Sequence, residues 1–524
     1  MHKVHFLAMQ NIPDRHFLPR LRRRYPMRYD TVAMLFYLLV VYVWGLRIHP
    51  LGRDYAVLAE RGSGLPFPAR VLFSAEMRFF EANPLGYHLV NLALLYGCML
   101  LLYHIVCRVV AGPKWLGLLA AVLFMANPVH SESMLNLGGI VDLVPCILAL
   151  AAFLGYVVYA ADPSLLKAIA ALALFALAAL PHPDNLALVA ALALYEAVAV
   201  KRENRRFVRL APFLALGVVG SAIHWQTLAT QGLSPARKFA PLYFIFYPVG
   251  FLPETARRFV EHPSLGWVSA GVIAVLLALV FRKARHPAVP FGFLAMAAVR
   301  LSQGTRAVDP VHLVGGGQLL LANAFFCLAL CAVFFRMMAH PKWPRIVIGG
   351  TTLLGAVLLG LQIRSVCAWR HAGSQVRTFQ AEAALAAATE SPGETLGLIP
   401  NYQYYVGAPM CLSESIAYDT PFGKALPATS LLPLHYDKPG RVEVAIEAWG
   451  PRTGRVVVKG KTPLELAPWP YRLSRPHNVH EAAHVRLKVV KADADSYVIE
   501  VTAKRDVLPR KLVSAPTPSF ASGQ

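Results

Sequence analysis

Long apolar stretches separated by short polar segments occupy the first two thirds of the chain. Seven of them approach the length of a membrane-spanning helix, at residues 31–46, 89–107, 140–161, 207–223, 265–281, 319–335 and 346–363. Four shorter apolar runs, at 116–126, 166–180, 186–200 and 289–301, lie between them. Because a helix needs about 20 mostly apolar residues to cross a bilayer, the pattern predicts a polytopic α-helical membrane protein with about eleven spans.

The pattern changes after residue 363, beyond which no further run is long enough to span a membrane. Segments 442–447 and 485–490 alternate apolar and polar residues, as half-buried strands do. A turn at 451–454 joins 441–449 to 455–459 in a predicted hairpin, and 496–503 supplies another strand. We therefore expect a basic arm at 1–29, a transmembrane domain at 30–365, an extracytoplasmic α/β-to-β-rich domain at 366–515 and a flexible tail at 516–524.

Composition agrees with the membrane class and excludes an ordinary soluble enzyme. Hydrophobic residues make up 56% of the 524 positions and charged residues only 15%. The net charge of +22 is explained by membrane topology and by contact with anionic lipids, and we prefer this to nucleic-acid binding.

Basic clusters indicate the orientation. They lie at 20–28, 201–206, 282–285 and 336–345, and all four reach the cytoplasm if the number of spans is odd and 241–251 is an interfacial or re-entrant helix. This predicts a cytoplasmic N-terminus, an extracytoplasmic C-terminus and an integral, multi-pass location in a bacterial inner membrane. The first apolar run lacks a small-residue cleavage site, so we expect a signal anchor.

The seven cysteines indicate little chemistry. Five lie in predicted spans, where a thiol behaves as a small hydrophobic group: Cys98, Cys107, Cys146, Cys327 and Cys331. Cys367 and Cys411 fall in the external part and are either paired or free. Motifs of zinc, nucleotide and serine-hydrolase sites are missing from the sequence; a divalent metal is compatible with it but not indicated.

Three polar blocks lie where predicted spans end. They read Asn83-Pro84-Leu85-Gly86-Tyr87-His88-Leu89-Val90-Asn91, Asn127-Pro128-Val129-His130-Ser131-Glu132-Ser133 and Gly138-Gly139-Ile140-Val141-Asp142. Ionisable groups are costly at membrane depth and are retained for function or for packing against partners. These blocks are therefore the candidate sites.

The order of these blocks resembles the GT-C class of integral-membrane glycosyltransferases. An acid follows the first span, an Asn-Pro pair with His88 and Asn91 opens the second, and an Asn-Pro pair with Glu132 ends the third. The resemblance covers about residues 30 to 365 and is nearest to the O-mannosyltransferase branch that carries tetratricopeptide repeats, which this chain lacks. It implies an active site outside the cytoplasm, a catalytic carboxylate in the first external loop and a sugar donor carried on polyprenyl phosphate.

By this resemblance Asp54 is the catalytic base, which removes a proton from an acceptor hydroxyl. The family has two adjacent acids at this place, whereas this chain has one. The alternative makes Asp54 an ion-pair partner of Arg53 or Arg70 at the membrane interface. Glu60, Glu76 and Glu81 lie in the same loop but match no motif position, so we expect solvated or interfacial charges there.

The chain departs from the family pattern mainly by losing cations. Gly-Arg-x-Asp appears as Gly139-Ile140-Val141-Asp142, Lys-Glu as His182-Pro183-Asp184, and Glu-Arg-Tyr as Gly316-Gly317-Gln318. A polyprenyl-phosphate leaving group is anionic, and a cation is the direct means of stabilising it. The candidates to replace the lost cations are Arg70, His182 and Arg306, and each has the alternative of an interfacial anchor.

The remaining polar residues have two interpretations. As substrate-binding residues, the set Arg70, His88, His130, Glu132, Asp142, His182, Asp184 and Arg306 contacts donor phosphate or sugar. As structural residues, the histidines and acids cap helix ends and connect neighbouring spans. The functional interpretation predicts that Asp54, His130, Glu132 and Asp142 approach one cavity near the external face.

Two functions follow from these observations. The first is a membrane glycosyltransferase that moves a sugar from a polyprenyl-phosphate donor to an extracytoplasmic acceptor. The alternative is a catalytically inactive GT-C-like scaffold subunit whose C-terminal domain binds other envelope proteins. The retained Asp54 favours the first, and the lost cations favour the second. Expected partners are membrane lipids and the lipid-linked donor, without nucleic acid.

Overall fold

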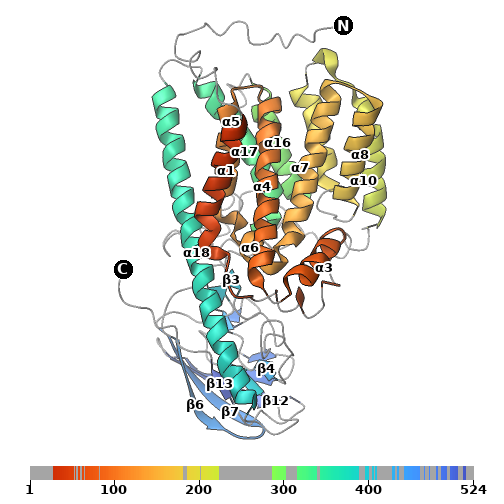
Figure 1. The fold of residues 1–524 in the computed structure, drawn as a ribbon. Helices are drawn as coiled ribbons and strands as arrows, with labels where there is room; N and C mark the ends of the chain where they lie inside the picture. Colours follow the sequence, from red (N-terminus) through yellow and green to blue (C-terminus); the bar gives the residue numbers. More distant parts are fainter. Residues whose placement is uncertain are drawn as a thin grey trace.

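The computed structural model places a bundle of helices at one end of a long helix and a set of β-strands at the other (Figure 1). It describes residues 27–51, 54, 57–58, 62–63, 65–81, 83–180, 186–200, 202–223, 286–302, 316–338 and 343–388 in the helical part. In the strand region it describes residues 396–399, 404–405, 408–409, 428–430, 434–435, 442–460, 465–466, 471–472, 479–481, 485–492, 496–504 and 512–514.

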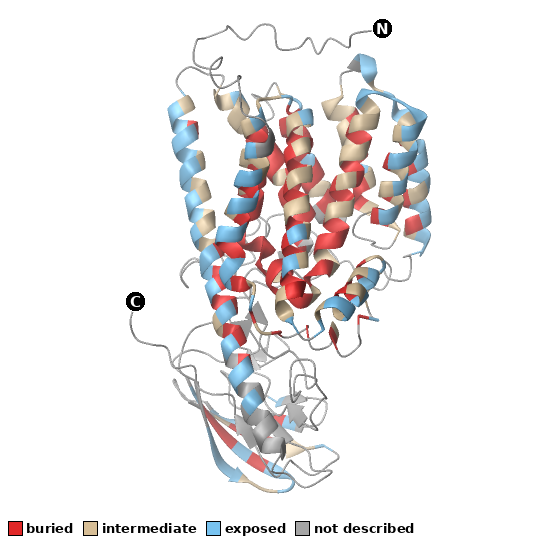
Figure 2. Ribbon diagram, viewed as in Figure 1, coloured by how far each residue is buried: buried red, intermediate tan, exposed pale blue. Residues whose placement is uncertain are grey.

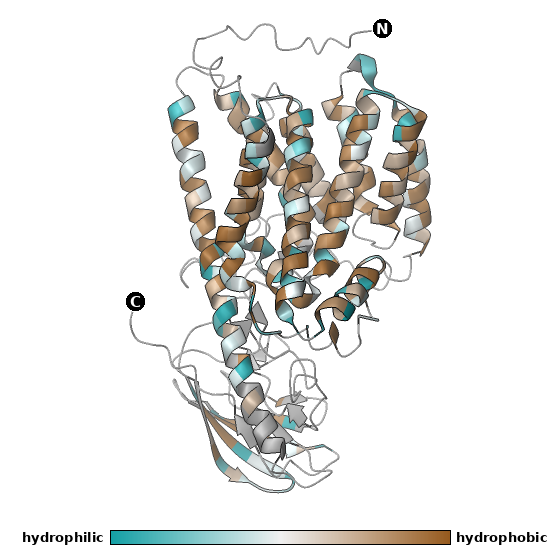
Figure 3. Ribbon diagram, in the orientation of Figure 1, coloured by the Kyte–Doolittle hydropathy of each residue, from teal (hydrophilic) through white to brown (hydrophobic). Residues whose placement is uncertain are grey.

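The bundle is built from apolar helices joined by short turns. In chain order they are α1 (Met27–Tyr42), η1 (Val43–Gly45), α3 (Ala69–Phe80), α4 (Pro84–Val109), α5 (Lys114–Ala126), η2 (Pro128–His130), α6 (Ser131–Leu135), η3 (Leu137–Gly139), α7 (Ile140–Ala161), α8 (Leu165–Ala179), α9 (Leu188–Leu194), η5 (Tyr195–Ala199), η6 (Arg202–Asn204), η7 (Phe207–Leu210), α10 (Ala211–Ile223), α16 (Ala288–Ser302), η9 (Gly316–Leu319), α17 (Leu320–Met338) and α18 (Pro344–Ala388). Hydrophobic residues occupy most of their length (Figure 3).

Within the described residues, four helices are long and apolar enough to cross a membrane. They are Pro84–Val109, Leu137–Ala161, Leu320–Met338 and Pro344–Thr378, and Lys114–Ala126 with Pro128–Leu135 makes a fifth if this pair, bent by 57°, is one span. This supports an integral membrane protein. The count of about eleven spans is not confirmed, because five further apolar helices are shorter. The predicted span at 265–281 and the helix at 241–251 lie outside the described residues.

An asparagine cap followed by proline begins both α4 and the helical turn after α5. Asn83 precedes α4, and its side-chain oxygen accepts a hydrogen bond from Leu85 N at 3.1 Å. Asn127 accepts from Val129 N at 3.2 Å, so the chain leaves α5 and begins a new helical turn in another direction. Each asparagine is followed by proline, which fits the first turn of a helix because it needs no backbone N–H there. The two Asn-Pro pairs therefore set the start of α4 and the bend after α5.

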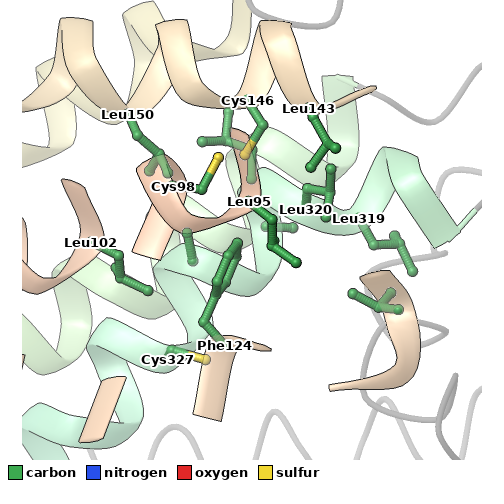
Figure 4. Close-up of a cluster of buried hydrophobic side chains, with 14 of the residues drawn as sticks. Leu95, Cys98, Leu102, Phe124, Leu143, Cys146, Leu150, Leu319, Leu320 and Cys327 are labelled. Atoms are coloured by element: carbon green, nitrogen blue, oxygen red, sulfur yellow. The ribbon is translucent and has the colours of Figure 1, made fainter. Parts of the chain in front are cut away.

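The core of the bundle lies where α4, α5, α7 and α17 meet (Figure 2). Leu95, Phe124, Cys146 and Cys327 are among its buried side chains and come from these four helices. Figure 4 shows Cys98 of α4 and Cys146 of α7 facing each other among leucines. These thiols are free and pack as small apolar groups, as the sequence indicated. Cys367 is free and exposed on α18, whereas Cys411 lies outside the described residues.

The strand region follows α18, whose 45 residues run without a break across the expected domain boundary at 365. Five antiparallel strands form one sheet in the order β10-β11-β12-β7-β6, from β6 (Val442–Trp449), β7 (Thr453–Gly460), β10 (Val479–Glu481), β11 (Val485–Ala492) and β12 (Ser496–Ala503). The β6–β7 pairing, with Val444 opposite Val458, confirms the predicted hairpin.

Smaller sheets complete the described strand region. β1 (Leu396–Ile399), β4 (Ala428–Ser430) and β13 (Leu512–Ser514) are parallel. β2 (Tyr404–Tyr405) pairs with β3 (Ala408–Pro409), and β5 (Leu434–His435), β8 (Glu465–Leu466) and β9 (Tyr471–Arg472) form the last sheet.

Candidate active site

Asp54 lies between α1 and α3 and is only 1% exposed. Its Oδ2 accepts a hydrogen bond from Leu51 N at 2.9 Å, and its Oδ1 accepts one from Gly138 N at 3.1 Å. Asn136 donates to the same carboxylate when its amide nitrogen faces Asp54, at 2.9 Å from Oδ2. The first loop is thereby connected to the turn before α7, a contact that the sequence did not indicate.

The ion-pair alternative for Asp54 is not observed with Arg70. The Arg70 side chain is exposed on α3, and the ion pair found among the described residues joins Lys167 to Asp162. Arg53 lies outside the described residues.

Burial raises the pKa of Asp54 to about 7, although backbone hydrogen bonds from Leu51, Gly138 and Leu137 act to lower it. A carboxylate with a pKa near neutrality exchanges its proton readily in that range. This is the property that a general base requires. Asp54 therefore has the ionisation behaviour of a base at neutral pH.

The segment from 127 to 139 connects α5 to α7 and is held by side chains of α4. Asn91 Nδ2 donates to Asn136 O at 2.8 Å, and His88 Nδ1 lies 3.3 Å from Met134 O. Both side chains are buried, with exposed fractions of 0% for Asn91 and 1% for His88. The positions of His88 and Asn91 three residues apart place them on one face of α4. They keep this connecting segment (residues 127–139) against the end of the bundle.

His130 belongs to the connecting segment but faces α5 and α17. Its Nε2 donates to Phe124 O at 2.5 Å, and Asn323 of α17 donates to the same carbonyl at 3.1 Å. Asn127 Nδ2 in turn donates to Asn323 Oδ1 at 3.3 Å. These contacts satisfy the carbonyl group at the C-terminal end of α5, where the helix is bent. The sequence could not indicate Asn323, because it lies 193 residues from His130.

Asp142 lies in the first turn of α7, and its Oδ2 accepts a hydrogen bond from Ser133 Oγ at 3.0 Å. The backbone of η9 packs directly against this pair: a Cβ added to Gly317 would overlap both the Asp142 carboxylate and the Ser133 hydroxyl. No side chain fits at position 317 without a shift of its neighbours. The long side chain of an arginine, which the GT-C resemblance would place here, therefore does not fit at position 317 in this arrangement.

Five of the predicted site residues lie in or contact the connecting segment, and two of them, His88 and His130, are described above. Asp54 contacts it through Gly138, Asp142 contacts it through Ser133, and Glu132 lies on α6 within it. Helix α6, which carries Glu132, lies at the end of the bundle that also carries α3 (Figure 1). A single cavity shared by these site residues stays a prediction. His182, Asp184 and Arg306 lie outside the described residues, and in the described part of the chain no three His, Cys, Asp or Glu side chains group as metal ligands.

The expectation that Glu76 is a solvated or interfacial charge is wrong. The side chain is 2% exposed, because Ala69, Phe73 and Glu76 follow at helical spacing and share the face of α3 that packs on α4 and α7. Both carboxyl oxygens are without a hydrogen-bond partner in the described structure. The 69, 73, 76 spacing was the signal in the sequence that would have placed Glu76 inward.

No protein-family model matches the chain, and no characterised protein matches it in sequence. Among solved structures, the apo oligosaccharyltransferase of Archaeoglobus fulgidus overlaps 72% of this chain and 62% of its own length, at 12% identity and a TM-score of 0.39. This chain thus spans less than two thirds of that enzyme.

ArnT from Cupriavidus metallidurans, solved with undecaprenyl phosphate bound, overlaps 70% of this chain and 82% of its own length at 13% identity and a TM-score of 0.39. Arabinofuranosyltransferase AftD from Mycobacteria overlaps 79% of this chain and 32% of its own length at 14% identity and a TM-score of 0.37. Similarities at this level do not assign the chain to a family or an activity.

Proposed function

We propose that this protein is an integral-membrane glycosyltransferase that transfers a sugar from a polyprenyl-phosphate donor to an acceptor outside the cytoplasm. The observation that carries the proposal is the buried carboxylate of Asp54 in the first loop, whose pKa is raised to about 7. It contacts the connecting segment, which also bears Glu132 and, through Ser133, contacts Asp142. The order of the polar blocks in the sequence supports the same function.

In the proposed reaction Asp54 acts as general base. It accepts the proton of an acceptor hydroxyl, whose oxygen forms a bond to the anomeric carbon of the sugar. The bond from that carbon to the phosphate oxygen breaks at the same time, and the lipid phosphate leaves with the electron pair. Glu132 and Asp142 are proposed to bind hydroxyl groups of the sugar, because carboxylate oxygens accept such bonds. Arg70, His182 and Arg306 remain the proposed phosphate ligands on the sequence argument alone.

The test is consumption of lipid-linked sugars by the purified full-length chain, supplied with a panel of polyprenyl-phosphate donors. We expect Asp54→Asn to abolish consumption, because the amide cannot accept a proton at neutral pH. Asp162→Asn is the matched control, because Asp162 is 80% exposed and lies in the turn between α7 and α8. Circular dichroism should show that both variants remain folded. Equal consumption by folded Asp54→Asn and by the unmodified protein would reject Asp54 as the base.

A second function, a catalytically inactive scaffold subunit, is favoured by the hydrogen bonds of Asp54. Both of its oxygens already accept bonds from backbone N–H groups, which is also the arrangement of a structural carboxylate. This alternative predicts that no donor in the panel is consumed and that other envelope proteins co-purify in a fixed ratio. Donor consumption that depends on Asp54 would exclude it.

A further inference from the structure

Glu76 is a buried acid at the end of the bundle where the candidate active site lies. Its side chain is 2% exposed, and neither Oε1 nor Oε2 has a partner among the described residues. Leaving a buried polar group without a hydrogen bond is destabilising. An apolar residue would fill the same space without this cost. The carboxyl group of Glu76 is therefore better explained by a ligand that forms a hydrogen bond with it.

The surroundings of Glu76 adjoin Asp54. The face of α3 that carries Glu76 packs into an apolar cluster with Leu58 of the first loop, Tyr87 of α4 and Leu137 of η3. Leu137 directly precedes Gly138, whose N–H donates to Asp54. A Cβ on Gly138 would also lie 3.5 Å from Val57 of this loop. Glu76 and Asp54 therefore border the same small cluster.

No cation faces Glu76 from the described elements packed against it. Tyr87 of α4 is the titratable neighbour, and its hydroxyl donates to Glu81 O at 2.9 Å. From α7 the cluster receives Ile140 and Val144, which are apolar, while Asp142 of that helix is bonded to Ser133.

On α3 itself, Arg70 and Arg78 are exposed on the opposite side. Burial raises the pKa of Glu76 to about 8. The side chain is therefore neutral at pH 7, and a neutral carboxyl group has an O–H to donate. A carboxylic acid kept neutral by an apolar site so that it can donate a hydrogen bond is an established device in enzymes.

A phosphate group is a ligand that such a donor fits. The sequence lacks the cations that the resemblance places near the leaving phosphate, and a neutral O–H binds an anionic oxygen without adding negative charge. We propose that Glu76, in its protonated form, donates a hydrogen bond to a phosphate oxygen of the lipid-linked donor and identifies the phosphate subsite beside Asp54. This inference rests on the proposed function, whose donor is a polyprenyl phosphate.

The ligand reaches Glu76 by a shift of α3, and the ends of this helix are suited to one. Pro68 precedes α3 without a side-chain capping bond, and Glu81 after it has a positive φ of 47°, which is strained for a residue other than glycine. The outer face presents Val71 and Phe79, which are 56% and 81% exposed, beside Arg78. A short helix with this mixture lies at a membrane interface, the depth at which lipid phosphates are found.

The experiment measures binding of undecaprenyl phosphate to the purified full-length chain at pH 7 and pH 9. Asp54 also ionises over this range, so every variant is compared in an Asp54→Asn background. With Glu76 intact we expect binding to weaken about tenfold at pH 9, because the ionised carboxylate no longer donates. Glu76→Gln should bind equally at both pH values, because its amide donates throughout, and Glu76→Leu should bind about tenfold more weakly at pH 7. Glu81→Gln, which changes an exposed acid at the end of the same helix, is the matched control and should bind as Asp54→Asn alone does.

The outcomes distinguish a failure of the Glu76 subsite from a failure of the proposed glycosyltransferase function. Binding of undecaprenyl phosphate that is unchanged in Glu76→Leu overturns the role of Glu76 and leaves the proposed donor standing. Failure of the unmodified protein to bind this lipid overturns both. Phosphatidic acid, a phosphomonoester lipid without a polyprenyl chain, is the second probe. If phosphatidic acid binds as tightly as undecaprenyl phosphate and depends equally on Glu76, the subsite does not belong to the polyprenyl-phosphate sugar donor.

Discussion

Replacing Gly317 with alanine is predicted to disturb Asp142 directly. The added methyl group would overlap the Asp142 carboxylate and the Ser133 hydroxyl, which are hydrogen-bonded to each other at 3.0 Å. Either the η9 backbone moves away from α7, or the bond between Ser133 and Asp142 breaks. Inserting a methylene group into a packed site costs about 1–3 kcal/mol, and losing a hydrogen bond to a charged group costs about 1.5–3 kcal/mol. We expect Gly317→Ala to lower the free energy of unfolding by about 2–3 kcal/mol.

A double-mutant cycle with Asp142→Ala tests the cause. Asp142→Ala alone loses the bond to Ser133, while in the double variant the new methyl group no longer meets a carboxylate. The combined loss in the free energy of unfolding should therefore be smaller than the sum of the single losses by about 1–2 kcal/mol. The measurement is reversible unfolding of the purified protein in mixed detergent micelles, followed by circular dichroism.

Gly355→Ala is the control for the change from glycine to alanine. No atom lies within 4 Å of a Cβ at position 355 on α18, so the substitution should be neutral or stabilising. Single losses that add within about 0.5 kcal/mol would refute the contact between Gly317 and Asp142 as the cause. A Gly317→Ala variant that is as stable as Gly355→Ala would refute the same contact.

Two further predictions concern topology and pH. A C-terminal tag should be reached by labelling reagents from outside the cytoplasm, because the four basic clusters lie inside only with an odd number of spans; a tag found in the cytoplasm would reject this orientation. Donor consumption should follow a bell-shaped pH profile, rising as Asp54 loses its proton near pH 7 and falling as Glu76 loses its proton near pH 8. The falling limb should disappear in Glu76→Gln, and a falling limb that persists there would contradict its assignment to Glu76.

The features that the sequence predicted correctly depend on neighbouring residues. Apolar runs predicted the membrane helices, and alternation around the 451–454 turn predicted the β6–β7 hairpin. The Asn-Pro pairs act through hydrogen bonds that span two residues, from Asn83 to Leu85 and from Asn127 to Val129. Such patterns have the same meaning wherever they occur in a chain, so they can be interpreted without the fold.

The features that the sequence did not indicate depend on packing between distant segments. The bond from Gly138 to Asp54 joins residues 84 positions apart, and the contact of Asn323 with His130 joins residues 193 apart. The burial of Glu76 was missed for another reason. A helix of 12 residues is too short to give an apolar run of spanning length, so its acids were treated as loop charges. The helical spacing of Ala69, Phe73 and Glu76 indicates an inward face, and its packing on α4 and α7 shows that this acid lies inside.

Asp54 and Glu76 are both buried acids, and their different hydrogen bonds suit them to opposite roles in the proposed site. Asp54 accepts bonds from Leu51 N and Gly138 N, which favour the ionised form and oppose the effect of burial on its pKa. Among the described residues Glu76 has no such donors, so burial raises its pKa without opposition and its proton is retained to a higher pH. Between about pH 7 and about pH 8, Asp54 is mainly ionised and accepts a proton, while Glu76 is mainly protonated and donates a hydrogen bond. In this way the backbone N–H groups of the first loop and of the connecting segment give the proposed base a lower pKa than the proposed hydrogen-bond donor.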